Sequence, residues 1–210
     1  AMGRRIAWGE FAENITTEGF PLFQMKPLDR LTAGEITLEV TQIGKKCHGN
    51  DCAIFKTTGD CVMPREGIFC RVVSPGVLQA GDEFVYHPKI LRIKIITVSD
   101  RVSRGEYDDR SGPLLKQLTD EYFMASGRST ESGIAVVPDE EDHIRNLIQG
   151  CIDEHYDLIF TSGGTGIGPR DHTPEAVKPI IQKEIPGIME LIRVKYGIQF
   201  PNALIRRSMA

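Results

Sequence analysis

Three apolar runs in the second half of the chain alternate with helix-length amphipathic stretches, and this alternation constrains the fold most. The runs are residues 90–98, 133–137 and 157–161, and the first is rich in isoleucine. Strands that alternate with amphipathic helices are typical of a parallel sheet covered by helices. The pattern therefore predicts an α/β domain. Each strand feeds a loop at its carboxyl end, which is the edge where open α/β sheets bind ligands.

Polar residues mark where the intervening helices begin. Ser111 is expected to cap a helix that runs to about Met124. Asp139 is expected to cap the next helix, whose first turn is acidic. From spacing alone, a plain helix cap and a ligand-binding role are equally compatible with Asp139.

The character of the sequence changes near Pro88. Before it, residues 36–41 and 68–73 alternate in or near period two, and glycines and prolines recur every few residues. The pattern therefore predicts that the residues before Pro88 form mostly β-strands. A length of 210 residues suits one full domain with a smaller module. We therefore expect a β module over residues 1–88 and an α/β domain over residues 89–210.

Composition narrows the possible partners. A formal net charge of −4 argues against nonspecific binding to nucleic acid or to an anionic membrane. No apolar run approaches the roughly 18 residues of a spanning helix, and no signal region follows the N-terminus. The sequence thus predicts a cytoplasmic protein that binds neither nucleic acid nor membrane.

The cysteines suggest thiol or metal chemistry before disulfides, because no secretion signal accompanies them. The spacing from Cys47 to Cys52 lies just outside that of a zinc knuckle, so zinc is disfavoured. Cys61 and Cys70 lie in apolar, strand-like stretches and are expected to be small buried residues.

The loop after the third strand is the most informative segment, residues 161–176. Its four glycines expose backbone N–H groups, and its hydroxyls add donors, so that it can hold a phosphate. Thr173 is expected to cap a helix whose N-terminus points at the same place, with Arg170 as a cationic donor. Asp171 would repel a phosphate directly, so it is expected to bind Mg²⁺ or a polar group of the ligand. The predicted phosphate-binding residues within the loop are Ser162, Gly163, Gly164, Thr165 and Gly166.

The common phosphate-binding motifs do not match this loop. A P-loop needs a lysine after its last glycine, whereas Pro169 and Arg170 follow Gly168. A dinucleotide-binding motif needs a further glycine at position 169 and should follow the first strand. The remaining alternative is a long turn without a ligand.

Several separate motifs resemble the Mog/MoaB family of molybdopterin-binding proteins, in that family's order. They are Val-Ser-Asp-Arg at 98–101, Val-Pro-Asp at 137–139, Thr-Ser-Gly-Gly-Thr-Gly at 161–166 and Pro-Arg-Asp-x-Thr-Pro-Glu-Ala at 169–176. Residues 107–112 add support of the same kind. The resemblance covers about residues 90–210.

This resemblance implies a three-layer α/β fold, a trimer or a multiple of one, and a role in molybdenum cofactor biosynthesis. In the Mog branch it implies an adenylyltransferase that moves AMP from Mg-ATP to the terminal phosphate of molybdopterin. The family's two key aspartates correspond to Asp139 and Asp171, as catalytic or Mg²⁺-binding residues. Ser99, Asp100 and Arg101 would line the same pocket. Relatives usually continue beyond the segment resembling residues 203–210, so the domain is expected to lack its last elements.

The first half resembles the later part of a MOSC domain, a β-barrel module related to the C-terminal part of molybdenum cofactor sulfurases. The resemblance rests on residues 9–16, 36–42 and 81–83 and covers about residues 4–87. The opening strands of such a module are missing, which predicts a partial barrel. The resemblance places the proposed sulfur-carrying cysteine at Cys47, where Lys45, Lys46 and His48 would favour the thiolate. A merely exposed thiol is the alternative.

Three functions remain open at this point. The chain is an adenylyltransferase acting on molybdopterin, a non-catalytic pterin-binding protein, or a sulfur carrier whose second domain docks the cofactor. The presence of both aspartates favours the first over the second. Other proteins of cofactor biosynthesis are possible partners.

The sulfur-carrier hypothesis predicts that Cys47 forms a persulfide. After incubation of the full chain with a persulfide donor, whose outer sulfur passes to the thiolate while the donor leaves as a thiol, mass spectrometry should detect one added sulfur on Cys47, and Cys47→Ser should lose this adduct. Cys70→Ser serves as the matched control and should keep it. An unchanged adduct in Cys47→Ser would exclude Cys47 as the carrier.

Overall fold

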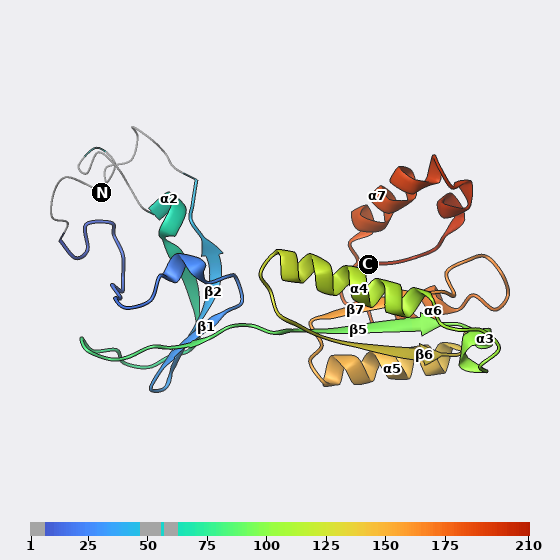
Figure 1. Ribbon diagram of the computed structural model, residues 1–210, viewed down its shortest axis with the longest axis horizontal. Helices are drawn as coiled ribbons and strands as arrows, with labels where there is room; N and C mark the ends of the chain where they lie inside the picture. Colours follow the sequence, from blue (N-terminus) through green and yellow to red (C-terminus); the bar gives the residue numbers. More distant parts are fainter. Residues whose placement is uncertain (1–6, 47–55, 57–62) are drawn as a thin grey trace. The chain divides into compact units, whose positions relative to one another are not determined.

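The computed structural model describes residues 7–46, 56 and 63–210. It divides the chain into two compact units, Ala1–Lys89 and Ile90–Ala210 (Figure 1). The first is built on an antiparallel sheet and the second on a parallel sheet with helices. The predicted fold class of each half is therefore confirmed.

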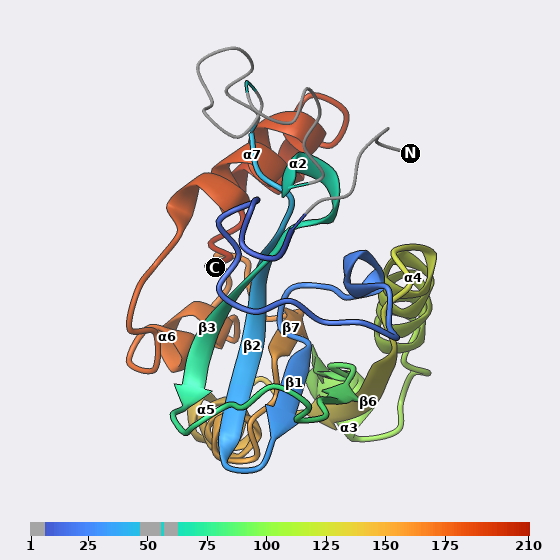
Figure 2. The same ribbon diagram turned by 90° about the vertical axis from the view of Figure 1, so that its left-hand side faces the viewer.

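The first unit contains a four-stranded sheet of order β3-β2-β1-β4, part of which is seen in Figure 2. Its core lies under β1 and β2 and consists of Met25, Leu31, Ile36, Leu38 and Val40. The described strands and short helices are η1 (Leu22–Gln24), β1 (Arg30–Ala33), β2 (Ile36–Ile43), α2 (Met63–Glu66), β3 (Ile68–Ser74) and β4 (Val85–His87).

Cys70 is not buried, contrary to the prediction from its apolar surroundings. It lies on β3, which forms one edge of the described sheet, and the central residues of this strand are exposed. An apolar run predicts a strand but does not reveal whether anything covers it. Cys61, for which burial was also predicted, lies outside the described residues.

A buried carboxylate stabilises the first unit. Asp29 is 2% exposed and accepts hydrogen bonds from the Tyr86 hydroxyl at 2.8 Å and from the backbone N–H groups of Lys26 and Lys89 at 2.8 and 3.0 Å. These donors compensate for removing the carboxylate from water. Asp29 thus joins the start of β1 to β4 and to the end of the unit.

The second unit contains a parallel three-stranded sheet of order β6-β5-β7, with helices α4 and α5 on opposite faces (Figure 1). Because β5 is central and covered on both faces, six of its eight residues are buried, which explains its run of isoleucines. The strands are β5 (Leu91–Val98), β6 (Thr130–Val137) and β7 (Leu158–Ser162). The helices are α3 (Asp100–Ser103), α4 (Ser111–Ala125), α5 (Glu141–Asp153), α6 (Thr173–Val177), α7 (Pro186–Gly197) and η3 (Pro201–Ile205).

The start of α4 differs from the prediction. Ser111 is the first helical residue, and Arg110 at the N-cap provides no side-chain cap. Asp109 supplies the acceptor instead, since its Oδ1 receives the N–H of Gly112 at 3.0 Å while its Oδ2 receives the Thr97 hydroxyl at 2.9 Å. The helix is therefore attached to the end of β5 through Asp109.

Strand β6 begins three residues before the predicted Gly133. Its polar start lacks an apolar pattern but pairs in register with β5 from Thr130 onward. The hydroxyls of Thr130 and Ser132 donate to Asp120 on α4, which also pairs with Lys116 at 2.6 Å. Tertiary hydrogen bonds thus compensate for the missing periodicity.

Asp120 makes the stability of the chain depend on pH. The hydrogen bond from Lys116, aided by Ser132 and Thr130, lowers the pKa of Asp120 from 3.8 to about 2. The ionised carboxylate therefore stabilises the folded state above the unfolded pKa, and this contribution is lost as the pH falls from 3.8 through the folded pKa. Asp120→Asn should cost about 1 kcal/mol at neutral pH.

Thermal unfolding of the intact chain between pH 7 and pH 2.5 measures this effect. Asp120→Asn should lose less stability than the unsubstituted chain as the pH falls. Asp108→Asn is the control, because Asp108 is exposed and makes no hydrogen bond or ion pair within the described chain. Parallel pH profiles for all three proteins would contradict the assignment.

Candidate functional site

The predicted site residues come together at the carboxyl edge of the parallel sheet. Val98 on β5 aligns with Val137 on β6, and Thr97 aligns with Ser162 on β7, so the three following loops begin at one edge. The loops that carry Asp100, Asp139 and Asp171 therefore meet, as the strand pattern predicted.

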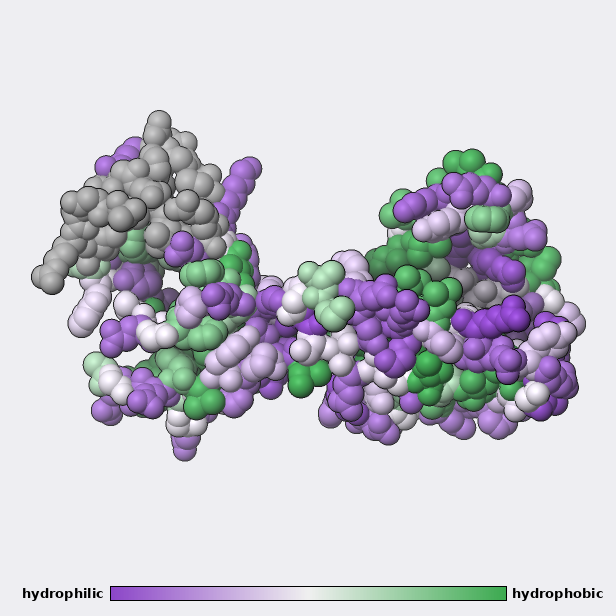
Figure 3. Space-filling model, viewed as in Figure 1, coloured by the Kyte–Doolittle hydropathy of each residue, from purple (hydrophilic) through white to green (hydrophobic). Residues whose placement is uncertain are grey.

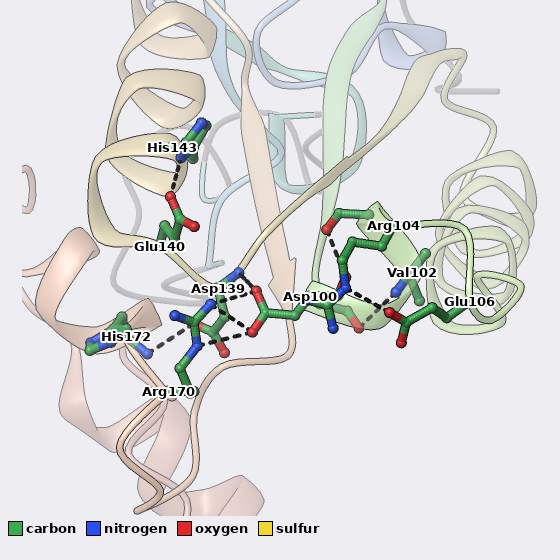
Figure 4. A network of polar contacts seen from close by, with 11 residues as sticks. Asp100, Val102, Arg104, Glu106, Asp139, Glu140, His143, Arg170 and His172 are labelled. Atoms are coloured by element: carbon green, nitrogen blue, oxygen red, sulfur yellow. Dashed lines mark hydrogen bonds and ion pairs between the residues drawn. The ribbon is translucent and has the colours of Figure 1, made fainter.

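Asp100 connects the three loops (Figure 4). Its Oδ1 accepts the backbone N–H of Asp139 at 3.0 Å, and its two oxygens accept a forked contact from Arg170 at 2.7 to 3.0 Å. The hydrogen bonds from Arg170 lower the pKa of Asp100, so the pair stays charged at neutral pH. Arg170 is therefore already bound to a carboxylate and is not the free cation that the sequence suggested.

Asp139 is buried, with 8% of its surface exposed. Its Oδ1 accepts the backbone N–H of His172 at 2.9 Å, while Glu140 occupies the N-cap of α5 without a side-chain cap. The helix-cap prediction for Asp139 is thus wrong, because the side chain points across to the third loop. Burial raises the pKa of Asp139, and the charge of Asp171 acts in the same direction.

The glycine loop packs too closely for side chains. Gly163 has φ of +111° and Gly164 of +59°, in the region that favours glycine. A Cβ at Gly163 would lie 2.0 Å from the carbonyl oxygen of Val98, and one at Gly164 would lie 2.7 Å from Asp139. The glycines are therefore required where this loop crosses β5 and the buried aspartate.

Thr173 fixes the glycine loop and does not cap a helix, contrary to the prediction. Its hydroxyl donates to the carbonyl oxygen of Gly163 at 2.9 Å, and its N–H donates to Gly164 at 3.0 Å. Thr173 is the first residue of α6, which has only five residues. So short a helix has a small dipole. An anion at this edge would therefore have to be held by individual N–H groups and side chains.

Asp171 lies against the same loop. Its Oδ2 accepts the N–H of Gly168 at 2.8 Å and would lie 2.6 Å from a Cβ at Gly166. Its Oδ1, like Oδ2 of Asp139, accepts no hydrogen bond within the described second unit. Each aspartate thus has one fixed oxygen and one that is available to a ligand.

These available oxygens are compatible with Mg²⁺. The ion prefers carboxylate oxygens and usually takes its other ligands from water and substrate phosphates. Among the described residues no group of three His, Cys, Asp or Glu side chains could hold a metal alone. Asp139 and Asp171 therefore suit an ion that arrives with a phosphate ligand better than a permanent structural metal.

The remaining predicted residues contribute less to the network. The Ser99 hydroxyl accepts the N–H of Val102 at 3.3 Å and caps α3. The guanidinium of Arg101 lies over the Tyr107 ring, 4.7 Å from its centroid. The hydroxyls of Ser162 and Thr165 make no hydrogen bond within the described second unit and remain available as donors.

Arg207 also belongs to the site, although no local sequence pattern indicated it. Its Nε donates to the Gly166 carbonyl oxygen and its guanidinium donates to that of Asp171, both at 2.6 Å, and it pairs with Glu175. Its backbone N–H also donates to Thr165 at 2.9 Å. No local pattern links residue 207 to the loop, so only the tertiary structure could reveal that it holds the glycine loop in place.

The first unit has a cavity of its own, of about 710 Å³. Apolar side chains dominate its lining, including Phe20, Phe23, Phe69 and Phe84. By contrast, the edge of the parallel sheet carries the backbone N–H groups of the glycine loop and the carboxylates of Asp100, Asp139 and Asp171. The sheet edge is therefore the better candidate for chemistry on an anionic ligand.

Comparison with protein families separates the same two halves. Residues 94–200 match the model described as a probable molybdopterin binding domain, and residues 1–85 match the MOSC domain. A molybdopterin adenylyltransferase of Helicobacter pylori is 38% identical over 121 residues, which cover 57% of this chain and 67% of the relative. The molybdenum cofactor biosynthesis protein B of Bacillus subtilis is 40% identical over 108 residues, covering 51% of this chain and 59% of the relative.

Solved structures show the same fold for the second unit. A molybdopterin biosynthesis protein from Mycobacterium abscessus has a TM-score of 0.51 and 32% identity, covering 58% of this chain and 74% of that one. The MoaB enzyme from a Thermus species has a TM-score of 0.50 and 36% identity, with the same coverage.

Fold and site together define an α/β protein with a closely packed glycine loop and two buried or loop-bound aspartates at the sheet edge. The chain belongs to the family of molybdopterin-binding domains of molybdenum cofactor biosynthesis, with a MOSC domain preceding that domain. None of the helices in the described part of the chain is long and apolar enough to cross a membrane.

Gly163→Ala tests the close packing of the glycine loop. The new methyl group would meet the Val98 carbonyl oxygen, which cannot move without disturbing β5, so the variant should lose about 2 kcal/mol or more of stability. Gly105→Ala is the matched control, since Gly105 also has positive φ but has open space around it. Urea unfolding should show a smaller loss for Gly105→Ala, and equal losses would refute a steric requirement.

Proposed function

We propose that the second unit transfers AMP from Mg-ATP to the terminal phosphate of molybdopterin. The observation that carries the proposal is the pair Asp139 and Asp171, each with one available oxygen beside a glycine loop. The resemblance to molybdopterin adenylyltransferases at 37 to 38% identity supports it.

The reaction requires positioning more than covalent help. An oxygen of the pterin phosphate attacks the α-phosphorus of ATP, a P–O bond forms there, and the bond to pyrophosphate breaks. Two anions that repel each other must be held in line, and the developing charge must be stabilised. A nucleophilic side chain is not needed for this displacement.

Mg²⁺ would be held by Asp139 and Asp171 together with phosphate oxygens. When bound, the ion would neutralise charge on the phosphates. Burial raises the pKa of Asp139 and disfavours its ionised form, as does the nearby charge of Asp171. A cation held by these carboxylates would favour their ionised forms and so oppose both effects, which is the electrostatic reason to assign them to a metal.

The glycine loop would bind the terminal phosphate of the pterin. Backbone N–H groups of residues 163–166 and the available hydroxyls of Ser162 and Thr165 are suitable donors. Ser99, Asp100 and Arg101 would border the pocket from the first loop. Arg170 would act through Asp100 as a positioning residue, because its forked contact fixes the loop that carries Asp139.

A pterin-binding protein without catalysis is the second candidate. It is favoured by the relatives named molybdenum cofactor biosynthesis protein B, which match at 40 to 41% identity. Such a protein would bind molybdopterin at the same loop without transferring AMP. Turnover with ATP separates the two functions.

Oligomerisation belongs to the same proposal. Leu114, Leu118 and Tyr122 form an exposed apolar stripe on α4, and Leu191, Val194 and Ile198 are exposed on or just after α7. Figure 3 shows apolar residues among polar ones where α7 and the following segment lie in Figure 1. Faces of this kind mark protein–protein contacts. A trimer is the expected state, and a monomeric mass in solution would contradict it.

A sulfur-carrying role for the first unit remains a separate prediction. The match of residues 1–85 to the MOSC domain supports it. Cys47 lies outside the described residues.

Asp171→Asn is the sharpest test of AMP transfer. The amide keeps the size of the side chain and can still accept the N–H of Gly168, so the loop should fold as before. Loss of the charge should reduce kcat by about 100-fold or more, while molybdopterin still binds. The measurement is AMP transfer from Mg-ATP to molybdopterin, followed by chromatography of the product.

Asp108→Asn provides the control, since it removes an exposed carboxylate that makes no hydrogen bond or ion pair in the described second unit. It should retain full turnover. If the original chain transfers AMP and Asp171→Asn does so equally fast, the role assigned to Asp171 is wrong. Binding of molybdopterin by the original chain without any transfer would favour the non-catalytic candidate.

A further inference from the structure

Arg206 lies beside the glycine loop although it is far from it in sequence. Its carbonyl oxygen accepts a hydrogen bond from Nε of Arg193 at 2.7 Å, and its N–H lies 3.3 Å from the Ala203 carbonyl oxygen. The next residue, Arg207, donates its N–H to Thr165. The backbone of Arg206 is therefore held on both sides and runs along the loop.

The guanidinium of Arg206 reaches over Gly166. One of its nitrogens lies 3.0 Å from the position that a Cβ on Gly166 would take, and Oδ2 of Asp171 lies 2.6 Å from the same position. Arg206 and Asp171 nevertheless form no ion pair in the fully described second unit. A cation and a carboxylate thus border one glycine without neutralising each other.

The neighbouring arginines have partners that Arg206 lacks. Arg170 binds Asp100, Arg207 binds two carbonyl oxygens and Glu175, and Arg193 donates to Ser208 as well as to the backbone of Arg206. The Arg206 side chain has no hydrogen bond or ion pair anywhere in the second unit, all of which is described. Its N–H donors are therefore available to a ligand.

We propose that Arg206 binds the terminal phosphate of molybdopterin above Gly166. The proposal rests on the proposed function, in which the glycine loop holds that phosphate. A phosphate there lies beside the negative charge of Asp171, and backbone N–H groups offer only partial charges to offset the repulsion. A guanidinium supplies a full charge and a planar pair of donors that fits phosphate oxygens. Arg206 thus takes the role that the sequence pattern suggested for Arg170.

The test compares the affinity of the full chain for molybdopterin and for the same pterin without its phosphate. Arg206→Gln should weaken molybdopterin binding by about 10-fold, because the variant loses one charge-assisted hydrogen bond at an exposed position. Arg206→Lys should restore part of the affinity, because it restores the charge without the planar fork. Binding of the dephosphorylated pterin should be the same in all three proteins.

Lys183→Gln is the matched control for lost charge. Lys183 is exposed and makes no ion pair or hydrogen bond in the second unit, so its removal should leave both affinities unchanged. Circular dichroism establishes that each variant is folded. In the transfer assay, Arg206→Gln should raise KM for molybdopterin with little change in kcat, as expected for a residue that binds the phosphate equally in the ground and transition states.

The outcomes separate this inference from the proposed function. Equal affinity of Arg206→Gln and the original chain for molybdopterin would overturn the inference, as would an equal loss for the dephosphorylated pterin. If the Arg206 effect is found but no AMP is transferred, adenylylation fails and the inference stands. If AMP is transferred with an unchanged KM in Arg206→Gln, the proposed function stands and the inference fails. No binding by the original chain would overturn both.

Discussion

The carboxylate of Asp100 joins the three loops at one edge of the parallel sheet. The sheet brings these loops together, but hydrogen bonds between their residues fix them in place. Asp100 accepts the N–H of Asp139 and the forked guanidinium of Arg170, which joins the loops after β5, β6 and β7. Asp139 in turn accepts the N–H of His172. Hydrogen bonds to a charged carboxylate are stronger than neutral ones, so these contacts hold the loops firmly. Asp139 and Asp171 each accept one backbone N–H through one oxygen. The carboxylates are therefore fixed in position while the other oxygen of each remains without a hydrogen bond in the described second unit.

The glycine loop adds a steric constraint to this electrostatic one. Gly163 approaches a strand carbonyl oxygen, Gly164 approaches Asp139, and Gly166 lies under Asp171 and Arg206. Thr173 and Arg207 donate hydrogen bonds to the carbonyl oxygens of the loop. These bonds use the acceptors of the loop and none of its N–H donors. This division of roles gives a backbone that is anchored through its acceptors and offers its donors, as anion binding requires.

Each of the two units has its own hydrophobic core, and each matches a different family model. The sheet of the first unit is antiparallel and that of the second is parallel. Their presence on one chain joins a molybdopterin-binding domain to a MOSC domain. The aspartates, arginines and glycine loop of the site all lie in the second unit, every residue of which is described. Cys47, the predicted sulfur carrier of the first unit, lies outside the described residues.

The sequence by itself determined the order of strands and helices along the chain, the parallel sheet, the sheet edge at which the loops meet, and the glycine-rich loop after the third strand. These follow from hydrophobic periodicity and from the steric freedom of glycine, which are local properties. The tertiary structure decided which partner each polar side chain takes. Arg170 pairs with a carboxylate 70 positions away, Asp139 and Thr173 bind a neighbouring loop where helix caps were expected, and Arg206 and Arg207 reach the site from the end of the chain. Contacts between residues so far apart leave no periodic signal, because they depend on how packed elements converge in space.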